Sequence, residues 1–371
     1  MLTAGFAATA SPIASARGID PDRPGTSTVY TETNQVSGNS VLAYRSGPGG
    51  TLTPIGSFNT GGSGTGASPA TQDGVVLGDG GRLLAVVNGG SDNVSVFAVT
   101  PSGRLRLIDV AGSGGVDPVS VTIRDGLVYV LNAGNASTPA NVAGFDLFGP
   151  PFQRQPIASR DLNPAASSPE QIGFSANGRD LVVTEKTSST VDVFPVNASG
   201  LAGAPVTTTI PGNVGPYGFA FTPTGVLTVT EAATNALATF ALNPSGTLQA
   251  ISTVPDGQVA PCWVALSANG GEAFVSNAHN GTISAYTVAP DGTLSLVAPA
   301  AQATVAAGNT DVAIGGSTLY IGDAPGVDAS TISPAGTLGA PTVAAGGLPA
   351  GTFGLASTPT PASGQGGGDA Q

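Results

Sequence analysis

Seven polar residues that could hold a cation or move a proton recur at one place in a repeated pattern. Each ends a short run of mostly β-branched or aliphatic residues, as in "LVVTE" and "LTVTE", which end at Glu185 and Glu231. The other five members are two acids and three amides: Glu32, Asp323, Asn88, Asn132 and Asn277. Oxygen ligands of these types bind hard cations such as calcium. Crowded carboxylates also raise one another's pKa, which suits acid–base chemistry, and the same residue types can simply bond freed backbone N–H groups where strands end.

A second group of candidates follows prolines at the start of the preceding strands. These residues are Glu170, Tyr217 and the pair Cys262–Trp263. Cys262 and His279 are the only cysteine and histidine and fall in one repeat, where they could form a nucleophilic dyad; the alternative is a packed thiol and a loop histidine. Trp263 is a core residue or a platform for a sugar ring.

The strands that must position these residues repeat along the chain with a period of about 40 to 45 residues. The clearest copy spans residues 168–210, and the turns "NASG", "NPSG" and "APDG", each followed by a short apolar strand, occur within this copy and the two copies after it. Such Asn-, Asp- and Gly-rich turns connect antiparallel hairpins. Four short strands per unit, repeated in this way, predict an all-β fold, a β-propeller of four-stranded antiparallel blades.

The seventh unit is divided between the two ends of the repeated region. Residues 28–58 supply a second, third and fourth strand without a first, whereas "PAGTFGLAS" at 349–357 matches the first strands and has no partners after it. Joining the two completes a seven-bladed ring and removes the exposed sheet edges that invite aggregation. We therefore predict one propeller domain over residues 27–357.

The N-terminal residues of the sequence predict export, and the C-terminal residues predict a flexible tail. Residues 1–26 are small and apolar and contain Ala14-Ser15-Ala16, an A-x-A pattern of the kind that signal peptidase cleaves, so they form a signal peptide or a disordered leader. Residues 358–371 are rich in Pro and Gly and are expected to be flexible. These features predict a secreted or cell-surface protein, and no later segment is apolar for long enough to span a membrane.

The amino-acid composition limits the classes of molecule that the protein is expected to bind. Asp and Glu outnumber Lys and Arg by 23 to 11 in the 371 residues, and this excess disfavours nucleic acids and anionic membranes. A single cysteine rules out an internal disulfide bond. The expected partner is a small-molecule ligand in the central channel or another protein. No cofactor is indicated with certainty, although the acidic ring could take a divalent cation such as calcium.

The repeats resemble the seven-bladed β-propeller lactonases, a family that includes 6-phosphogluconolactonase-like enzymes and fungal muconate cycloisomerases. The likeness rests on units such as "GPYGFAFTPTG" followed by "TVTE", and "SPEQIGFSANGRDLVVTE". It implies the propeller fold, and it implies lactone chemistry by association. The His and Arg residues that the family carries after its strand-start prolines are replaced here by Glu170, Tyr217 and Cys262, and Ala232 stands where the family has Glu. This departure disfavours phosphorylated substrates.

Two functions remain open from the sequence. The first is an exported hydrolase or isomerase of a neutral lactone or sugar-like molecule, with Glu185 or Glu231 as general base and Tyr217, His279 and Asn277 as hydrogen-bond donors. The second is a non-catalytic binding or scaffold propeller, because the family's His and Arg residues are missing. Turnover of neutral lactones that is lost on substituting the glutamates would separate the two.

Overall fold

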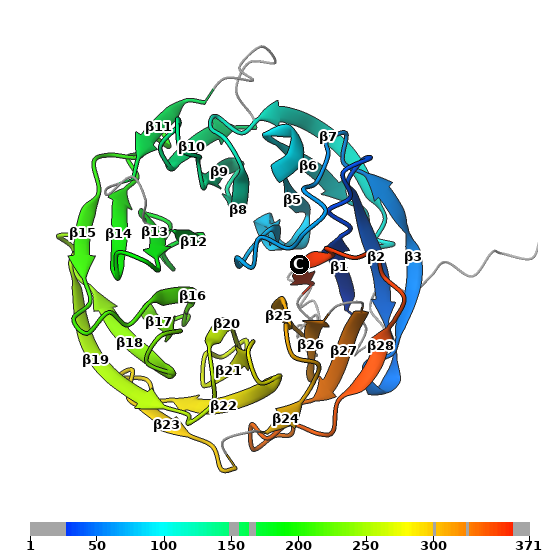
Figure 1. The fold of residues 1–371 in the computed structure, drawn as a ribbon, viewed down its shortest axis with the longest axis vertical. Helices are drawn as coiled ribbons and strands as arrows, with labels where there is room; N and C mark the ends of the chain where they lie inside the picture. Colours follow the sequence, from blue (N-terminus) through cyan, green and yellow to red (C-terminus); the bar gives the residue numbers. More distant parts are fainter. Residues whose placement is uncertain (1–26, 148–155, 163–167, 300–301, 324–325, 359–371) are drawn as a thin grey trace, which may run out of the picture.

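Seven β-sheets stand in a ring around a common centre (Figure 1). The computed structural model describes residues 27–147, 156–162, 168–299, 302–323 and 326–358. The sequence-predicted leader of residues 1–26 and all but the first residue of the predicted tail lie outside these ranges. Helical structure among the described residues consists of three short 3-10 turns: η1 (Pro48–Gly50), η2 (Asp79–Gly81) and η3 (Gly89–Ser91). No helix in this part of the chain has the length and apolar character to cross a bilayer.

Each sheet is one antiparallel blade, numbered here 1 to 7 from the N-terminus. The innermost strands are β29 (Phe353–Ser357), β4 (Val75–Gly78), β8 (Pro118–Arg124), β12 (Pro169–Phe174), β16 (Pro216–Phe221), β20 (Pro261–Leu266) and β25 (Asp311–Gly315). The second strands are β1 (Thr28–Glu32), β5 (Leu83–Asn88), β9 (Leu127–Asn132), β13 (Asp180–Glu185), β17 (Val226–Glu231), β21 (Glu272–Asn277) and β26 (Thr318–Asp323). The third strands are β2 (Ser40–Ser46), β6 (Asn93–Val99), β10 (Asn141–Asp146), β14 (Thr190–Pro195), β18 (Ala236–Leu242), β22 (Thr282–Val288) and β27 (Gly326–Thr331). The outer strands are β3 (Leu52–Asn59), β7 (Leu105–Gly112), β11 (Ala158–Asp161), β15 (Val206–Thr209), β19 (Leu248–Pro255), β23 (Leu294–Leu296) and β28 (Thr342–Ala345).

The ring closes as the sequence predicts. Strand β29, from the C-terminal end of the propeller, pairs antiparallel with β1, so that Val29 lies opposite Ser357. The Thr28 amide also donates to Thr358 Oγ1 at 2.8 Å, and Thr31 Oγ1 donates to the Phe353 carbonyl at 3.1 Å. Closure pairs the edge of β1 that would otherwise be the exposed inner edge of a three-stranded sheet.

Among the residues that the structure describes, blade 6 alone has an additional strand. Its outer strand β23 is short, and a further two-residue strand, β24 (Ala303–Thr304), pairs with the other end of β22. Pro299 lies between the two pieces, and proline cannot donate to a ladder of hydrogen bonds. The edge of this blade is therefore built from two fragments.

The blades are held together by apolar packing between their faces. The second strands are covered on both faces, which explains their nearly continuous apolar sequences. Between blades 3 and 4, Tyr129 packs in one buried cluster with Ile172 and Phe194. Its hydroxyl donates to the carbonyl of Gly200, in the next blade, at 2.5 Å. A buried tyrosine thus supplies apolar area and a hydrogen bond across the blade boundary.

The segment that joins β3 to β4 crosses the centre of the ring (Figure 1). Its Gln72 side chain donates to the Val264 carbonyl at 2.9 Å and accepts from the Val264 amide at 3.2 Å. The Gln72 amide donates to the Glu170 carbonyl at 3.2 Å. The Trp263 indole Nε1 donates to the Thr71 carbonyl at 3.0 Å. These bonds tie the segment to blades 4 and 6, so it forms a floor across the channel.

A pair of carboxyl groups lies next to this floor, near the ring axis. Asp73 Oδ2 accepts from Gln171 Nε2 at 2.6 Å, and Asp311 Oδ2 accepts from the Leu355 amide at 2.9 Å. Burial raises the pKa of Asp73 to about 7, against the lowering effect of the Gln171 hydrogen bond. Burial and then the charge of Asp73 raise the pKa of Asp311 well above its usual range. At neutral pH the pair therefore retains protons.

Candidate functional site

A cavity of about 360 Å³ opens at the channel mouth, on the face where the second strands end. The starts of β8, β12 and β16 surround it, and the crossing segment at Ala70–Thr71 lines it. Its chemically functional side chains are Asp117, Ser168, Glu170, Lys186 and Tyr217. They come from blades 3, 4 and 5, which are consecutive around the ring, so the ring arrangement is what assembles the site.

Glu170 is the titratable group of this cavity whose pKa best suits proton transfer at neutral pH. Its side chain is buried, and Ser168 Oγ donates to Oε1 at 3.2 Å. Burial raises the pKa of Glu170 to about 7, although the positive charge of Lys186 and hydrogen bonds from Ser168 and Tyr217 act in the opposite direction. Because both protonation states are then populated at neutral pH, the carboxyl can accept a proton and return it.

Lys186 supplies a positive charge next to Glu170. It is the only lysine in the sequence and follows directly after β13. Its amide donates to the Ser168 carbonyl at 3.0 Å, and its Nζ lies 5.0 Å from the centre of the Tyr217 ring. An ammonium over an aromatic face is held by cation–π attraction. Sequence reasoning did not select Lys186, although its uniqueness and its place after a strand-end glutamate were a usable signal.

The structure brings Tyr217, Cys262 and Trp263 together beside Glu170. The Tyr217 and Trp263 rings pack edge to face, with centroids 5.9 Å apart. Burial is the main cause that raises the pKa of Tyr217, and the Glu170 charge adds to it. Burial also raises the pKa of the Cys262 thiol to about 12, so that thiol stays protonated at neutral pH. Trp263 is fully buried and its indole N–H is bound to the floor, as a core residue would be.

His279 is not among the residues that line this cavity. It is exposed, and its amide donates to the Val259 carbonyl at 3.3 Å. The charged groups that influence the pKa of Cys262 are Lys186 and Glu170. The Cys262 thiol therefore has the Glu170 cluster as its electrostatic surroundings.

The amide members of the strand-end ring bond either at the boundary with the preceding blade or within their own blade. Asn88, in blade 2, accepts from Thr60 Oγ1 at 2.7 Å and from Asn39 Nδ2 at 3.1 Å, both from the blade 1 side. Asn132 Nδ2 donates to the carbonyl of Ser113 at 3.2 Å, in the link that arrives from blade 2. Asn277 Nδ2 donates to Ser284 Oγ at 3.0 Å within its own blade. These bonds lead to the preceding blade or stay within one blade, and they do not cross the channel.

The glutamates bond to residues of the loops that follow their own strands. Glu32 accepts from Asn39, and burial raises its pKa well above the usual range. Glu231 accepts from Thr234 Oγ1 at 2.9 Å, and burial raises its pKa also. Glu185 accepts from Ser188 Oγ at 3.4 Å. Burial raises the pKa of Asp323. None of these four residues is among those that line the cavity, and their catalytic or ligand-binding roles stay predictions.

Metal binding by the ring also stays a prediction. In the part of the chain that the structure describes, His, Cys, Asp and Glu side chains do not gather in groups of three or more that could hold an ion. Elemental analysis of the purified protein tests the calcium prediction: stoichiometric calcium supports it, and its absence contradicts it.

Comparisons with known proteins agree with the fold. A family model described as "Lactonase, 7-bladed beta-propeller" matches residues 223–312. A search of curated proteins found no significant match. Among solved structures, a candidate 6-phosphogluconolactonase from Bacteroides fragilis is similar at TM-score 0.69 and 16% identity, covering 94% of this chain and 99% of that one. The periplasmic gluconolactonase of Pseudomonas aeruginosa is similar at TM-score 0.66 and 17% identity, covering 91% and 100%.

A protein of unknown function from Desulfotomaculum acetoxidans is similar to the same extent, at TM-score 0.69 and 14% identity, covering 90% of this chain and 99% of that one. At such identities a structural match reports the fold alone, because one fold hosts many activities. The chain is thus a seven-bladed β-propeller that resembles the lactonase propellers, in fold over most of its length and in sequence over residues 223–312.

Proposed function

We propose that the protein is a lactonase-type hydrolase that opens a neutral lactone in the cavity at the channel mouth. The observation that carries the proposal is the buried Glu170 carboxyl group, which lies beside Lys186 in a cavity of about 360 Å³. Its pKa is raised to about 7. Cavities of roughly 300 to 1,000 Å³ are typical of small-molecule sites. A titratable group tuned to neutral pH in such a place is a candidate general base.

In the proposed reaction, Glu170 removes a proton from a water molecule as its oxygen attacks the lactone carbonyl carbon. The carbonyl oxygen takes up the electron pair, and the Lys186 ammonium stabilises the resulting negative charge. When the ring C–O bond breaks, Glu170 returns the proton to the departing alkoxide oxygen. One water is consumed and the product is a hydroxy acid. The Tyr217 hydroxyl, bonded to Glu170, orients the carboxyl group.

The charges around the cavity favour an uncharged substrate. Among the described residues that line it, Lys186 is the only cationic one, and Asp117 and Glu170 are acidic. A phosphorylated sugar lactone would need additional Lys or Arg side chains to balance its phosphate. For this reason the gluconolactonase named among the similar structures is the better guide to the substrate than the 6-phosphogluconolactonase.

Location outside the cytoplasm is part of the proposal. It is supported by Ala14-Ser15-Ala16 in an N-terminal stretch of small and apolar residues. The single cysteine is buried, so the protein does not depend on a reducing compartment to protect it. Cell fractionation tests it. Recovery of a mature form without residues 1–16 outside the cytoplasm supports export, and recovery of the unprocessed chain in the cytoplasm contradicts it.

A panel of neutral γ- and δ-lactones tests the activity, and five variants locate the base. Glu170→Gln should lower kcat by about 10²- to 10⁴-fold, the usual range for a general base. Lys186→Met should lower it as well, whereas Glu185→Gln and Glu231→Gln should retain turnover and Tyr217→Phe should lose less than Glu170→Gln. If Glu185→Gln or Glu231→Gln abolished turnover while Glu170→Gln did not, the base would be in the strand-end ring. If no lactone were hydrolysed and a stable protein partner were captured, the binding-propeller function would replace this proposal.

A further inference from the structure

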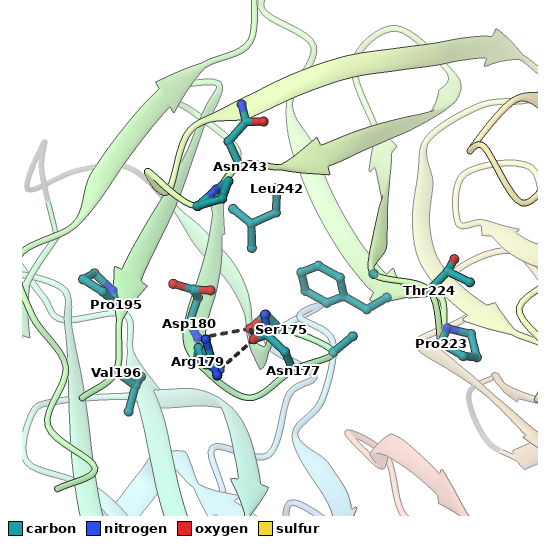
Figure 2. Close-up of a pocket in the computed structure, with 14 residues that line it drawn as sticks. Ser175, Asn177, Arg179, Asp180, Pro195, Val196, Pro223, Thr224, Leu242 and Asn243 are labelled. Carbon is teal, nitrogen blue, oxygen red and sulfur yellow. Dashed lines mark hydrogen bonds between the residues drawn. The ribbon is translucent and has the colours of Figure 1, made fainter. Parts of the chain in front are cut away.

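A second and larger cavity, of about 770 Å³, lies between blades 4 and 5 (Figure 2). Strand β12 connects the two cavities: Pro169 at its start lines the first, and Ser175, just past its end, lines the second. A strand of this length spans about 20 Å at roughly 3.3 Å per residue. The second cavity is therefore on the opposite face of the ring and is independent of the proposed active site.

Turns from two blades form this cavity. The β12–β13 turn of blade 4 contributes Asn177 and Arg179, the start of β13 contributes Asp180, and blade 5 contributes Phe221 and Leu242. Figure 2 shows the Asp180 carboxylate from blade 4 and Leu242 from blade 5 on facing sides of the space. The turn of blade 4 is rigid, because the Asp180 amide donates to Ser175 Oγ at 3.1 Å and the Arg179 amide donates to Asn177 Oδ1 at 2.9 Å.

Neighbouring blade junctions on this face are occupied by the protein itself. Between blades 3 and 4, Arg124 Nη1 donates to the Ala176 carbonyl at 3.1 Å. Between blades 5 and 6, a Cβ added at Gly270 would meet Pro223 Cδ at 2.6 Å, so the turns are in contact. Between blades 4 and 5, the Arg179 guanidinium has no hydrogen bond to any described residue. The donor is therefore available to a ligand.

The chemistry of the lining specifies the ligand. Of the described residues that line the cavity, only Arg179 and Asp180 are charged, and their charges cancel, so a neutral ligand fits best. A carboxylate, a guanidinium and an amide together offer donors and acceptors in planar pairs. The ring of Phe221 and three prolines, at positions 195, 223 and 244, provide apolar surfaces. A pyranose presents the complementary pattern, with hydroxyl groups at its rim and C–H groups on its faces.

We propose that the cavity between blades 4 and 5 binds a neutral oligosaccharide, with Asp180 accepting and Arg179 donating hydrogen bonds to its hydroxyl groups. Because this cavity opens to the surface between the two turns, it can accommodate an internal stretch of a sugar chain as well as its end. Such a site would hold the protein on a glycan while the opposite face remains free.

A printed array of neutral, acidic and amino oligosaccharides tests the proposal with the full-length protein, followed by calorimetric titration with the strongest neutral binder. Asp180→Ala should weaken binding about tenfold or more, as expected on losing one charged hydrogen-bond partner. Blade 6 offers a matched control, because Ser267–Gly270 repeats the Ser-Ala-Asn-Gly sequence of Ser175–Gly178. Glu272→Ala, at the position equivalent to Asp180, should leave the affinity unchanged.

Glu170→Gln, on the other face, should also bind the oligosaccharide as the unsubstituted protein does, so failure of the proposed hydrolase would not affect the result. Unfolding temperatures of the variants confirm that each is folded. The proposal is overturned if no neutral oligosaccharide binds, if only acidic or amino sugars bind, or if folded Asp180→Ala and Glu272→Ala variants bind equally well.

Discussion

The side-chain amide of Gln72 pairs with the backbone of Val264 in both directions, donating to its carbonyl at 2.9 Å and accepting from its amide at 3.2 Å. Gln171 forms the same pair with Phe219, donating to its carbonyl at 3.0 Å and accepting from its amide at 2.5 Å. Both backbone partners lie next to register shifts at the starts of β20 and β16. Two glutamines thus satisfy backbone groups of innermost strands, and one of them fixes the floor of the channel.

Gln72→Ala should destabilise the protein by about 1 to 3 kcal/mol, the usual cost of leaving a buried polar group without its partner. The substitution leaves both the Val264 amide and its carbonyl without the Gln72 side chain. Urea unfolding followed by circular dichroism measures the change. Gln35→Ala removes a glutamine whose side chain is bonded at the surface, to the Ala350 carbonyl at 2.9 Å, and should cost less than about 0.5 kcal/mol. Equal losses in the two variants would show that the floor is not held by Gln72.

The rate of lactone hydrolysis should rise with pH through about pH 7, because Glu170 acts as a base only when deprotonated and burial raises its pKa to about 7. Lys186 acts in the opposite direction and lowers this pKa. Lys186→Met should therefore move the rising limb of kcat/KM to higher pH, as measured by initial rates between pH 5 and pH 9. A limb that stayed in place, or that moved to lower pH, would contradict the assignment of Glu170.

Asp73→Asn should make the protein more stable at pH 8 than the unsubstituted chain. Burial raises the pKa of Asp73 from 3.8 to about 7, so the folded state binds more protons than the unfolded state between these values. Stability therefore falls as pH rises from about 4 to 7. Asparagine keeps an acceptor for Gln171 and tolerates the positive φ of 63° at this position. Calorimetric unfolding temperatures at pH 4 and pH 8 check the prediction, which fails if the two proteins have the same pH dependence.

Tyr129→Phe should destabilise the boundary between blades 3 and 4 by about 1 to 2 kcal/mol. The hydroxyl donates to the Gly200 carbonyl at 2.5 Å and accepts from the Ala202 amide at 2.9 Å, and phenylalanine can do neither. Tyr44→Phe is a matched control, because Tyr44 is also buried and its hydroxyl has no hydrogen bond to another described residue. Chemical unfolding compares the two variants. Similar losses would mean that the bonds across the boundary contribute little.

The fold followed from the sequence because the repeats encode it locally. Runs such as "LVVTE" and "LTVTE" are buried second strands, β13 and β17, and Gly-containing turns separate them from the first strands. Closure by residues 353–357 was also predictable, since a first strand without partners and three strands without a first can only complete each other.

The site was harder to predict, because its residues meet only through contacts between blades. The strand-end pattern drew attention to Glu185 and Glu231, whereas their hydrogen bonds lead to nearby Ser and Thr hydroxyls. Glu170 and Tyr217 were selected by their place after a proline, and both line the cavity. The crossing segment was not foreseen, because the position of "ATQDG" depends on bonds to Glu170 and Val264 that leave no local pattern in the sequence.

The turnover of a neutral lactone by Glu170→Gln tests the central claim most directly, because glutamine keeps the size of the side chain and removes only its ability to take a proton. With the variant shown to be folded, the account predicts that kcat at pH 8 falls by at least about 100-fold. A kcat within a few-fold of that of the unsubstituted protein would contradict the assignment of Glu170 as the general base.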